Sequence, residues 1–253
     1  MPGGERRSVD ADWYEHAFGD LYSVLYAHRT VEAAAPEAAF AAEALGLRPG
    51  HRLLDLCCGS GRHLVHFARM TDHAVGLDYS RELLFHGRAQ HGAALRAVRA
   101  DMRAVPFAGA FDAVTNFFTS LGYFKDDAEN MQVIAEIAGA LKPSGRFFID
   151  YVNAAYVRAT LEPLTVRSSG GYAIEERRWI DERTRRLNKT TRVTRGGAVE
   201  RELGESVRLY DEEELRALLE HAGLRCECAF GDYTGTPPAP TAPRLILTGP
   251  KCR

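Results

Sequence analysis

The chain has 253 residues, of which 45% are hydrophobic and 26% are charged, and its formal net charge is −2. This composition is typical of a folded globular protein and excludes wholesale disorder. A charge so close to neutral also argues against a general nucleic-acid binder or a polybasic membrane binder. The N-terminus is polar and no apolar run approaches about 18 residues, so we expect neither a signal peptide nor a membrane span, and a cytoplasmic location.

The five cysteines include no C-x-x-C pair. Zinc sites of the structural kind need four well-placed ligands, which this spacing does not supply. We therefore expect reduced thiols and no bound metal.

Strand and helix patterns alternate over the first 150 residues. Short apolar runs predict strands, and segments with apolar side chains at helical spacing follow them. The expected strands are His51–Leu56, His73–Asp78, Leu95–Ala100, Phe111–Phe118 and Arg146–Val152, and the expected helices are Ser60–Met70, Arg81–Gln90 and Asp127–Leu141. This alternation implies right-handed crossovers and a parallel sheet with helices on both faces.

The pattern changes after about residue 163. Three stretches of strand character, separated by turn signals such as Gly196-Gly197, predict an antiparallel meander; they are Tyr172–Ile180, Leu187–Thr194 and Glu200–Tyr210. The last expected elements are a helix over Asp211–Ala222 and strands over Arg225–Phe230 and Arg244–Thr248. The predicted fold is therefore α/β: a Rossmann-like, doubly wound, seven-stranded sheet with an antiparallel last strand, plus an inserted antiparallel β meander.

Three parts follow from this division. We expect an N-terminal helical flap at residues 1–47, a ligand-binding core at residues 48–162 and 209–253, and the meander at residues 163–208 as a cover for the substrate.

The end of the first predicted strand carries the clearest chemical signal. Gly59 and Gly61 let a ligand approach the backbone closely at a helix N-terminus, although Gly-x-Gly alone is shared by many nucleotide-binding folds. Leu64 stands where the dinucleotide fingerprint has its third glycine. Asp55 would repel a pyrophosphate but favours a cationic ligand, and Asp78 can accept hydrogen bonds from both hydroxyls of a ribose. A ligand with an adenosine, no phosphate and a positive charge fits: S-adenosylmethionine.

Five motifs then occur in the order found in the class I S-adenosylmethionine-dependent methyltransferases, which the chain resembles. They are Leu53–Gly61, Gly76–Ser80, Ala100–Arg103, Phe111–Val114 and Leu141–Arg146. Further segments resemble a group of bacterial small-molecule-type methyltransferases and extend the likeness over most of the chain; they are Tyr26–Arg29, Asn116–Phe124, Arg208–Tyr210 and Gly231–Tyr233. The proline-rich stretch at 237–243 departs from that group.

The resemblance implies S-adenosylmethionine as the cofactor, S-adenosylhomocysteine as its product, and no metal. The residues that it assigns to the cofactor are Tyr26, Arg29, Asp55, Cys57, Gly59, Gly61, Asp78, Tyr79, Asp101, Met102, Asn116 and Phe117. Of these, Asp78 would hold the ribose, and Asp101 and Met102 would contact the adenine. Asn116 and Phe117 would lie beside the sulfonium.

An aromatic stripe at four-residue spacing, Tyr14, Phe18, Tyr22 and Tyr26, marks the N-terminal segment. On spacing alone it predicts a helix face packed on the sheet. The resemblance favours a flap over the cofactor, with Arg29 binding the methionine carboxylate.

Methyl transfer is an in-line displacement at carbon, so it needs no covalent nucleophile on the protein. A general base is needed only when the acceptor carries a proton that must leave. The candidates are His28, Asp150, Tyr151 and Tyr22, whereas His63 is interpreted as structural.

The resulting prediction is methyl transfer to a small-molecule acceptor, without nucleic-acid or membrane partners, by a monomer or homodimer. An RNA or protein methyltransferase on the same core is an alternative, although the basic residues of the meander are nearly balanced by acidic ones. A nicotinamide-dependent oxidoreductase is disfavoured by Asp55 and Leu64. A binding protein without turnover is a further alternative.

Overall fold

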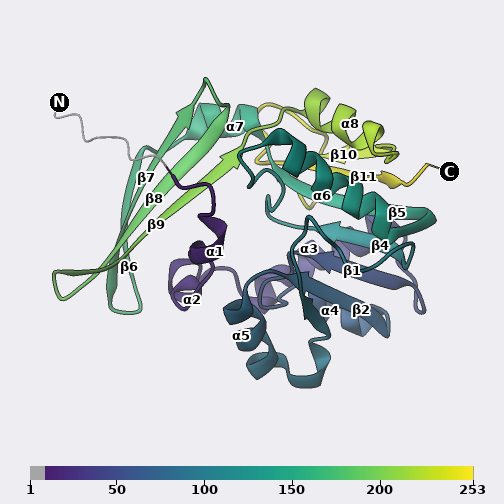
Figure 1. Ribbon diagram of the computed structural model, residues 1–253, viewed down its shortest axis with the longest axis horizontal. Helices are drawn as coiled ribbons and strands as arrows, with labels where there is room; N and C mark the ends of the chain where they lie inside the picture. The colour runs from purple at the N-terminus through teal and green to yellow at the C-terminus, as the bar shows by residue number, and fades with distance from the viewer. Residues whose placement is uncertain (1–8, 253) are drawn as a thin grey trace.

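The computed structural model describes residues 9–252, which form two β-sheets (Figure 1). The first eight residues of the predicted N-terminal flap lie outside the described residues. In Figure 1 the larger sheet carries most of the helices, and a separate four-stranded sheet lies beside it, with the N-terminal helices α1 and α2 between the two.

The larger sheet has seven strands in the order β10-β11-β5-β4-β1-β2-β3. The strands are β1 (Arg52–Leu56), β2 (His73–Asp78), β3 (Ala97–Arg99), β4 (Phe111–Asn116), β5 (Leu141–Val152), β10 (Cys228–Phe230) and β11 (Arg244–Pro250). Strands β1 to β5 are parallel, and β11 pairs antiparallel with both β5 and β10. The predicted fold class is confirmed. The strand order reverses between β1 and β4, and open α/β sheets bind ligands at the carboxyl ends of strands beside such a point.

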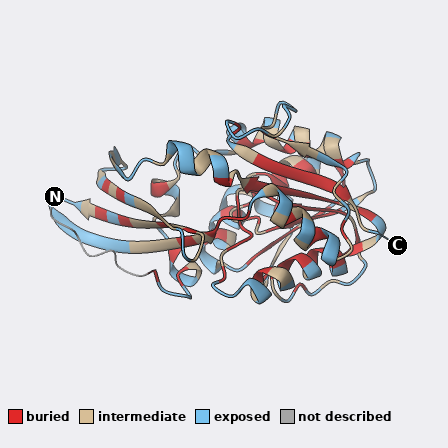
Figure 2. Ribbon diagram, turned by 90° about the horizontal axis from the view of Figure 1, so that it is seen from above, coloured by how far each residue is buried: buried red, intermediate tan, exposed pale blue. Residues whose placement is uncertain are grey.

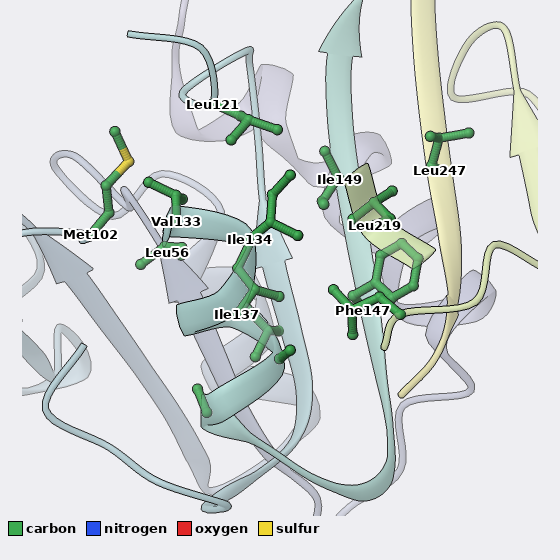
Figure 3. Packing of buried hydrophobic residues seen from close by; sticks show 14 of the residues in the cluster. Leu56, Met102, Leu121, Val133, Ile134, Ile137, Phe147, Ile149, Leu219 and Leu247 are labelled. Atoms are coloured by element: carbon green, nitrogen blue, oxygen red, sulfur yellow. The ribbon is translucent and has the colours of Figure 1, made fainter. Parts of the chain in front are cut away.

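Helices cover both faces of this sheet. They are α3 (Val31–Leu45), α4 (Leu64–Met70), α5 (Arg81–His91), a short 3₁₀ turn (Gly92–Ala94), α6 (Asp127–Ala140), α7 (Ala154–Thr160) and α8 (Glu212–His221). On one face, Ile134 and Ile137 of α6 pack over Phe147 and Ile149 of β5 (Figure 3). Because side chains alternate along a strand, Phe148 points to the other face and joins the core beneath α3 and α4.

Helix α3 lies within the predicted helical flap of residues 1–47, but the sequence predicted neither its range nor its packing on the core sheet. Thr30 caps the start of this helix by accepting the N–H of Ala33, and Gly46 ends it with a left-handed φ of 61°. Its buried residues are Ala34, Ala38, Ala41 and Leu45. Alanine is the best helix former, but its small side chain gives almost no hydrophobic contrast along the sequence, so periodicity alone misses such a helix.

The second sheet is an antiparallel meander of four strands, not the predicted three. They are β6 (Leu164–Ser169), β7 (Tyr172–Asp181), β8 (Arg186–Arg195) and β9 (Ala198–Arg208). The additional strand, β6, is an edge strand whose Leu164 and Val166 are exposed, so it lacks the pattern of a half-buried strand. Figure 2 shows how much of the meander is exposed or only half-buried compared with the core sheet.

The N-terminal segment forms two short helices, α1 (Tyr14–Ala17) and α2 (Tyr22–Leu25), instead of one continuous helix. Val9, Trp13 and Ala17 are buried in one small cluster, which Val207 of β9 contacts. Leu25 packs against Ile174 and Val193 of the meander. The aromatic stripe therefore packs between the two sheets.

Arg186, at the start of β8, joins the meander to the core. Its guanidinium is buried and donates hydrogen bonds to the carbonyl oxygens of Gly122 (3.1 Å), Tyr123 (2.8 Å) and Phe124 (2.8 Å), and to Ser206 on β9. One side chain thus holds the loop after β4 against the second sheet.

We predict that Arg186→Met lowers the free energy of unfolding by about 2–4 kcal/mol, because several buried carbonyl groups lose their donor. Arg192→Met is the matched control: Arg192 lies on the same strand but is half exposed in a surface ion pair with Glu202, so a change within about 0.5 kcal/mol is expected. Urea unfolding measures both. Equal effects of the two substitutions would contradict the assigned role of Arg186.

Candidate functional site

A cavity lies at the carboxyl ends of β1, β2 and β4, where the fold predicts a ligand site. It is open to solvent at its mouth and is lined by both polar and apolar side chains. The predicted residues that line it are Tyr22, Arg29, Cys57, Gly59, Asp78, Tyr79, Asp101, Met102 and Phe117. Residues from six separate segments of the sequence therefore meet at one place. We call it the first cavity.

The loop after β1 forms one wall through left-handed backbone. Gly59 has a φ of 56° and Gly61 a φ of 84°, and a Cβ on Gly61 would lie 2.1 Å from Leu95 Cδ1. Cys57 also has a φ of 63°, which is a strained conformation for a residue with a side chain and costs of order 1 kcal/mol. Gly59 therefore lines the first cavity as predicted, whereas Gly61 does not line it and leaves room for the Leu95 side chain.

Asp78 holds this loop in place. One of its carboxylate oxygens accepts the Gly59 N–H at 2.7 Å and the other accepts the Ser80 N–H at 2.8 Å. The side chain is buried, and burial raises its pKa while these backbone hydrogen bonds lower it. Both hydrogen bonds come from backbone N–H groups, and the remaining lone pairs of the two oxygens can accept hydrogen bonds from a ligand.

Asp101 and Met102 line the opposite side of the first cavity. The Asp101 carboxylate is paired with the Arg103 guanidinium at 2.6 Å, an arrangement that sequence reasoning did not foresee. Partial burial is the largest single influence on the pKa of Asp101 and raises it. The hydrogen bonds and the charge of Arg103 together outweigh burial, so the pKa is lowered. Met102 Sδ lies 3.4 Å from Cys57 Sγ.

The segment after β4 closes the cavity. Phe118 and Thr119 have positive φ angles of 56° and 63°. Asp150 stabilises this turn: its carboxylate accepts the Phe118 N–H at 2.8 Å, and its carbonyl oxygen accepts the Thr119 N–H. The Phe118 ring in turn has the guanidinium of Arg62 4.2 Å from its centre.

Asp55 and Asn116 lie beneath the loop instead of lining the first cavity. Both are buried; Asp55 accepts a hydrogen bond from Thr115 Oγ1 at 2.9 Å, and Asn116 donates to the Leu56 carbonyl oxygen at 3.0 Å. Burial raises the pKa of Asp55 to about 7. One oxygen of each side chain, Asp55 Oδ2 and Asn116 Oδ1, has no hydrogen-bond partner among the described residues.

A second cavity adjoins the first, between α2 and the inner face of the meander. Arg29 lines both cavities. Tyr26 and His28 line only the second, so Tyr26 does not contact the first cavity as the resemblance implied. The Tyr26 hydroxyl is 2.7 Å from both Glu205 Oε1 and Lys189 Nζ of the meander.

Two of the four predicted base candidates are held away from base chemistry. Tyr151 is fully buried and donates its hydroxyl proton to the Arg208 carbonyl oxygen, and it lines neither cavity. Asp150 is fully buried and engaged by Arg244 and Tyr233, each at 2.6 Å. The prediction of Tyr151 was wrong because neighbouring strand residues face opposite sides, and Asp150 fixes the loop. Tyr22 lines the first cavity and His28 the second.

Sequence reasoning missed several residues of the first cavity, notably Arg62, whereas Phe118 and Tyr123 line it as the sequence predicted for aromatic walls of a pocket. Arg62 directly follows the glycine loop, so its position could have been inferred. His63 also lines the cavity but is held structurally, stacked on Phe117 with 4.0 Å between ring centres and with Nε2 2.7 Å from Glu37.

Comparisons with known proteins identify methyltransferases as the proteins that this chain resembles. Residues 53–145 match a family model described as a methyltransferase domain. A 134-residue segment is 34% identical to the dTDP-3-amino-3,4,6-trideoxy-alpha-D-glucopyranose N,N-dimethyltransferase of Streptomyces venezuelae, covering 52% of this chain and 56% of that protein. The chain thus spans about half the length of this curated relative.

Two solved structures share the fold over nearly the whole chain. The CcbJ methyltransferase from Streptomyces caelestis is similar with a TM-score of 0.78 at 19% identity, covering 94% of this chain and 99% of that one. An S-adenosylmethionine-bound amino pentose methyltransferase from Micromonospora echinaspora is similar with a TM-score of 0.67 at 23% identity, covering 92% and 97%.

Within residues 9–252, no helix has the length and apolar character of a membrane span, and no group of three or more potential metal ligands comes together.

The buried histidine gives a prediction about pH. Burial lowers the pKa of His63 to about 4, although the hydrogen bond to Glu37 acts in the opposite direction, whereas an unfolded histidine titrates near 6.5. Between these values the unfolded chain binds the extra proton, so His63 destabilises the fold as pH falls. When the pH is lowered from 7 to 5, the difference in free energy of unfolding between His63→Gln and the parent should therefore shift by about 2 kcal/mol in favour of the variant.

Urea unfolding at the two pH values measures this difference, with the exposed His73→Gln as the control. Parallel pH profiles for the parent and His63→Gln would show that His63 is not kept neutral by the fold.

Proposed function

We propose that this chain, which carries a class I S-adenosylmethionine-dependent methyltransferase domain, transfers the methyl group of that cofactor to a small-molecule acceptor. The proposal rests on one observation: Arg29 lines both cavities, so the two cavities adjoin each other. The first has the features of a site for an adenosine-containing cation, and the second offers an adjoining space for an acceptor.

The first cavity fits the adenosine part of the cofactor. The free lone pairs of Asp78 would accept hydrogen bonds from the ribose hydroxyls, and Gly59, which lines the cavity without a side chain, would let the ligand approach the loop backbone. Met102 would lie against the adenine ring, and Asp101, whose two oxygens both accept hydrogen bonds from Arg103, would take the adenine amino group as a further donor.

The methionine part of the cofactor would extend from Gly59 toward Arg29. Arg29 has its guanidinium 4.3 Å from the centre of the Tyr26 ring and 5.1 Å from that of Phe118, and its fork is free to bind a carboxylate. Asp55 and Asn116 do not line the cavity, so their unpartnered oxygens would act on the ammonium group through an intervening water.

When bound, S-adenosylmethionine supplies a methyl group made electrophilic by the adjacent sulfonium. The residues of the chain would then align the acceptor and exclude water, which can account for effective molarities of about 10⁵–10⁸ M. Tyr22, Phe118 and Tyr123 line the first cavity with aromatic side chains suited to this exclusion. His28 would take the proton of an acceptor that must lose one, because burial, followed by the charges of Arg29, Arg167 and Arg62, lowers its pKa and keeps it neutral near pH 7.

The acceptor is proposed to be small because the meander and α2 limit the space available to it. The likeness to an amino-sugar N,N-dimethyltransferase makes an amine the first acceptor class to assay. A cytoplasmic location, a monomeric or homodimeric state and the absence of nucleic-acid partners remain predictions from the sequence.

Replacing the ribose acceptor should weaken cofactor binding. Asp78→Ala removes a charged acceptor whose hydrogen bonds contribute about 1.5 kcal/mol or more each, so we expect the affinity for S-adenosylhomocysteine to fall at least tenfold. Equilibrium dialysis measures the affinity, and thermal unfolding verifies that the variant is folded. The exposed Asp72→Ala is the control and should bind as the parent does. A folded Asp78→Ala protein with unchanged affinity would exclude Asp78 as the ribose ligand.

The acceptor class is tested by incubating the protein with methyl-labelled S-adenosylmethionine and a bacterial extract separated into small-molecule, protein and RNA fractions. We expect the label to transfer to the small-molecule fraction. Label found mainly on RNA or protein would contradict the proposed acceptor class.

A further inference from the structure

The second cavity has an unusual balance of charge for a partly enclosed space. Its charged lining residues are the cations Arg29, Arg167, Arg178 and Lys189 and the carboxylates Glu176 and Glu205. With His28 neutral, two positive charges are in excess. Most of these groups lie on one face of the meander, because Glu176 and Arg178 are two residues apart on β7, and Lys189 pairs in register with both Arg178 and Glu205.

Four of these charges neutralise one another. Lys189 is 2.6 Å from Glu205 and 3.6 Å from Glu176, and Arg178 is 2.6 Å from Glu176. Arg178 also donates to Thr165 Oγ1 at 3.0 Å. This network is internally balanced, so the excess positive charge resides on the other two guanidinium groups.

No carboxylate among residues 9–252 lies within ion-pair distance of Arg29 or Arg167, although the charge of Arg167 is one of the weaker causes that lower the pKa of Glu176. Arg167 donates to the Leu25 carbonyl oxygen at 2.6 Å, and Arg29 makes only a 3.4 Å contact with the Tyr22 hydroxyl besides its aromatic neighbours. The Arg29 Nε atom is buried and has no hydrogen-bond partner in the described part of the chain. A guanidinium withdrawn from water without a counter-ion is costly, and a bound anion would offset that cost.

The lowered pKa of His28 reflects the same excess of positive charge. After burial, the largest causes of its lowered pKa are the charges of Arg29 and Arg167. A neutral imidazole beside two cations can donate a hydrogen bond to an anion, or accept a proton from a group next to one.

We propose that the second cavity binds an anionic group of the methyl acceptor, a carboxylate or a phosphate, and that Arg167 is its principal ligand. The inference rests on the proposed function. The two unpaired guanidinium groups then have different roles. Arg29 lines both cavities and binds the cofactor carboxylate. Arg167 lines only the second cavity and binds the acceptor. The planar fork of arginine suits either anion. The acceptor therefore carries its anion at a distance from the atom that is methylated.

The site is tested directly with inorganic phosphate and with acetate, each compared with chloride at equal ionic strength. Both should raise the melting temperature of the parent loaded with S-adenosylhomocysteine. Arg167→Gln should weaken the binding of these probes at least tenfold and leave the affinity for S-adenosylhomocysteine within twofold. The control, Arg177→Gln, removes an exposed arginine on the neighbouring strand β7 that pairs with Glu175, and it should bind both probes as the parent does.

Probe binding that is unchanged in folded Arg167→Gln, or absent in the parent, would overturn the anion site. An equal loss of affinity for S-adenosylhomocysteine in Arg167→Gln would overturn the division of duties between Arg29 and Arg167.

The labelled small-molecule products of the extract assay extend the test to the acceptor. Anion exchange at pH 7 should retain them, and phosphatase treatment distinguishes a phosphate, whose label is then released from the resin, from a carboxylate, whose label stays. With the purified acceptor, Arg167→Gln should raise KM at least tenfold with a smaller change in kcat.

Labelled small molecules that pass through as neutral or cationic species would overturn this inference while the proposed function stands. An absence of label in all small molecules would instead count against the proposed function, and the phosphate and acetate titrations would still decide the anion site.

Discussion

The fully buried carboxylate of Asp150 makes the interactions on which the wall of the first cavity depends. It accepts the Phe118 N–H and is held in place by Arg244 and Tyr233, so it fixes a turn in which two consecutive side-chain-bearing residues have left-handed backbone. Such a turn is strained by about 1–3 kcal/mol for each residue and persists only when its surroundings determine it. The result is that the Phe118 ring stands between Arg29 and Arg62, at the wall of the first cavity.

A second connection links this turn to the meander. A few residues after Phe118, the carbonyl groups of Gly122 to Phe124 accept hydrogen bonds from the buried Arg186 of β8. The core sheet and the meander are therefore joined through the segment that closes the first cavity. This arrangement explains how an inserted sheet can hold an acceptor at a defined position relative to a cofactor in the core, since methyl transfer depends on alignment more than on any reactive side chain.

How far the sequence predicted the structure depended on the range of the interactions. The glycine loop, Asp78 and the seven-stranded sheet were predictable because local patterns and strand ends determine them. The role of Asp150 was not, because its partners Tyr233 and Arg244 lie 83 and 94 residues away. The range of helix α3 was missed because alanines give no periodic signal, and strand β6 because its apolar side chains are exposed. The second cavity, formed by residues from α2 to β9, had no signal in the sequence beyond the position of His28 and Arg29.

The central claim is that one cavity holds the cofactor, the adjoining one holds the acceptor, and Arg29 stands between them. A crystal structure of the protein with S-adenosylhomocysteine tests it most directly. The account predicts the ribose hydroxyls at the Asp78 carboxylate, the homocysteine carboxylate at Arg29, and no part of the ligand against Arg167. A ligand whose adenosine occupies the second cavity, or whose ribose lies away from Asp78, would contradict it.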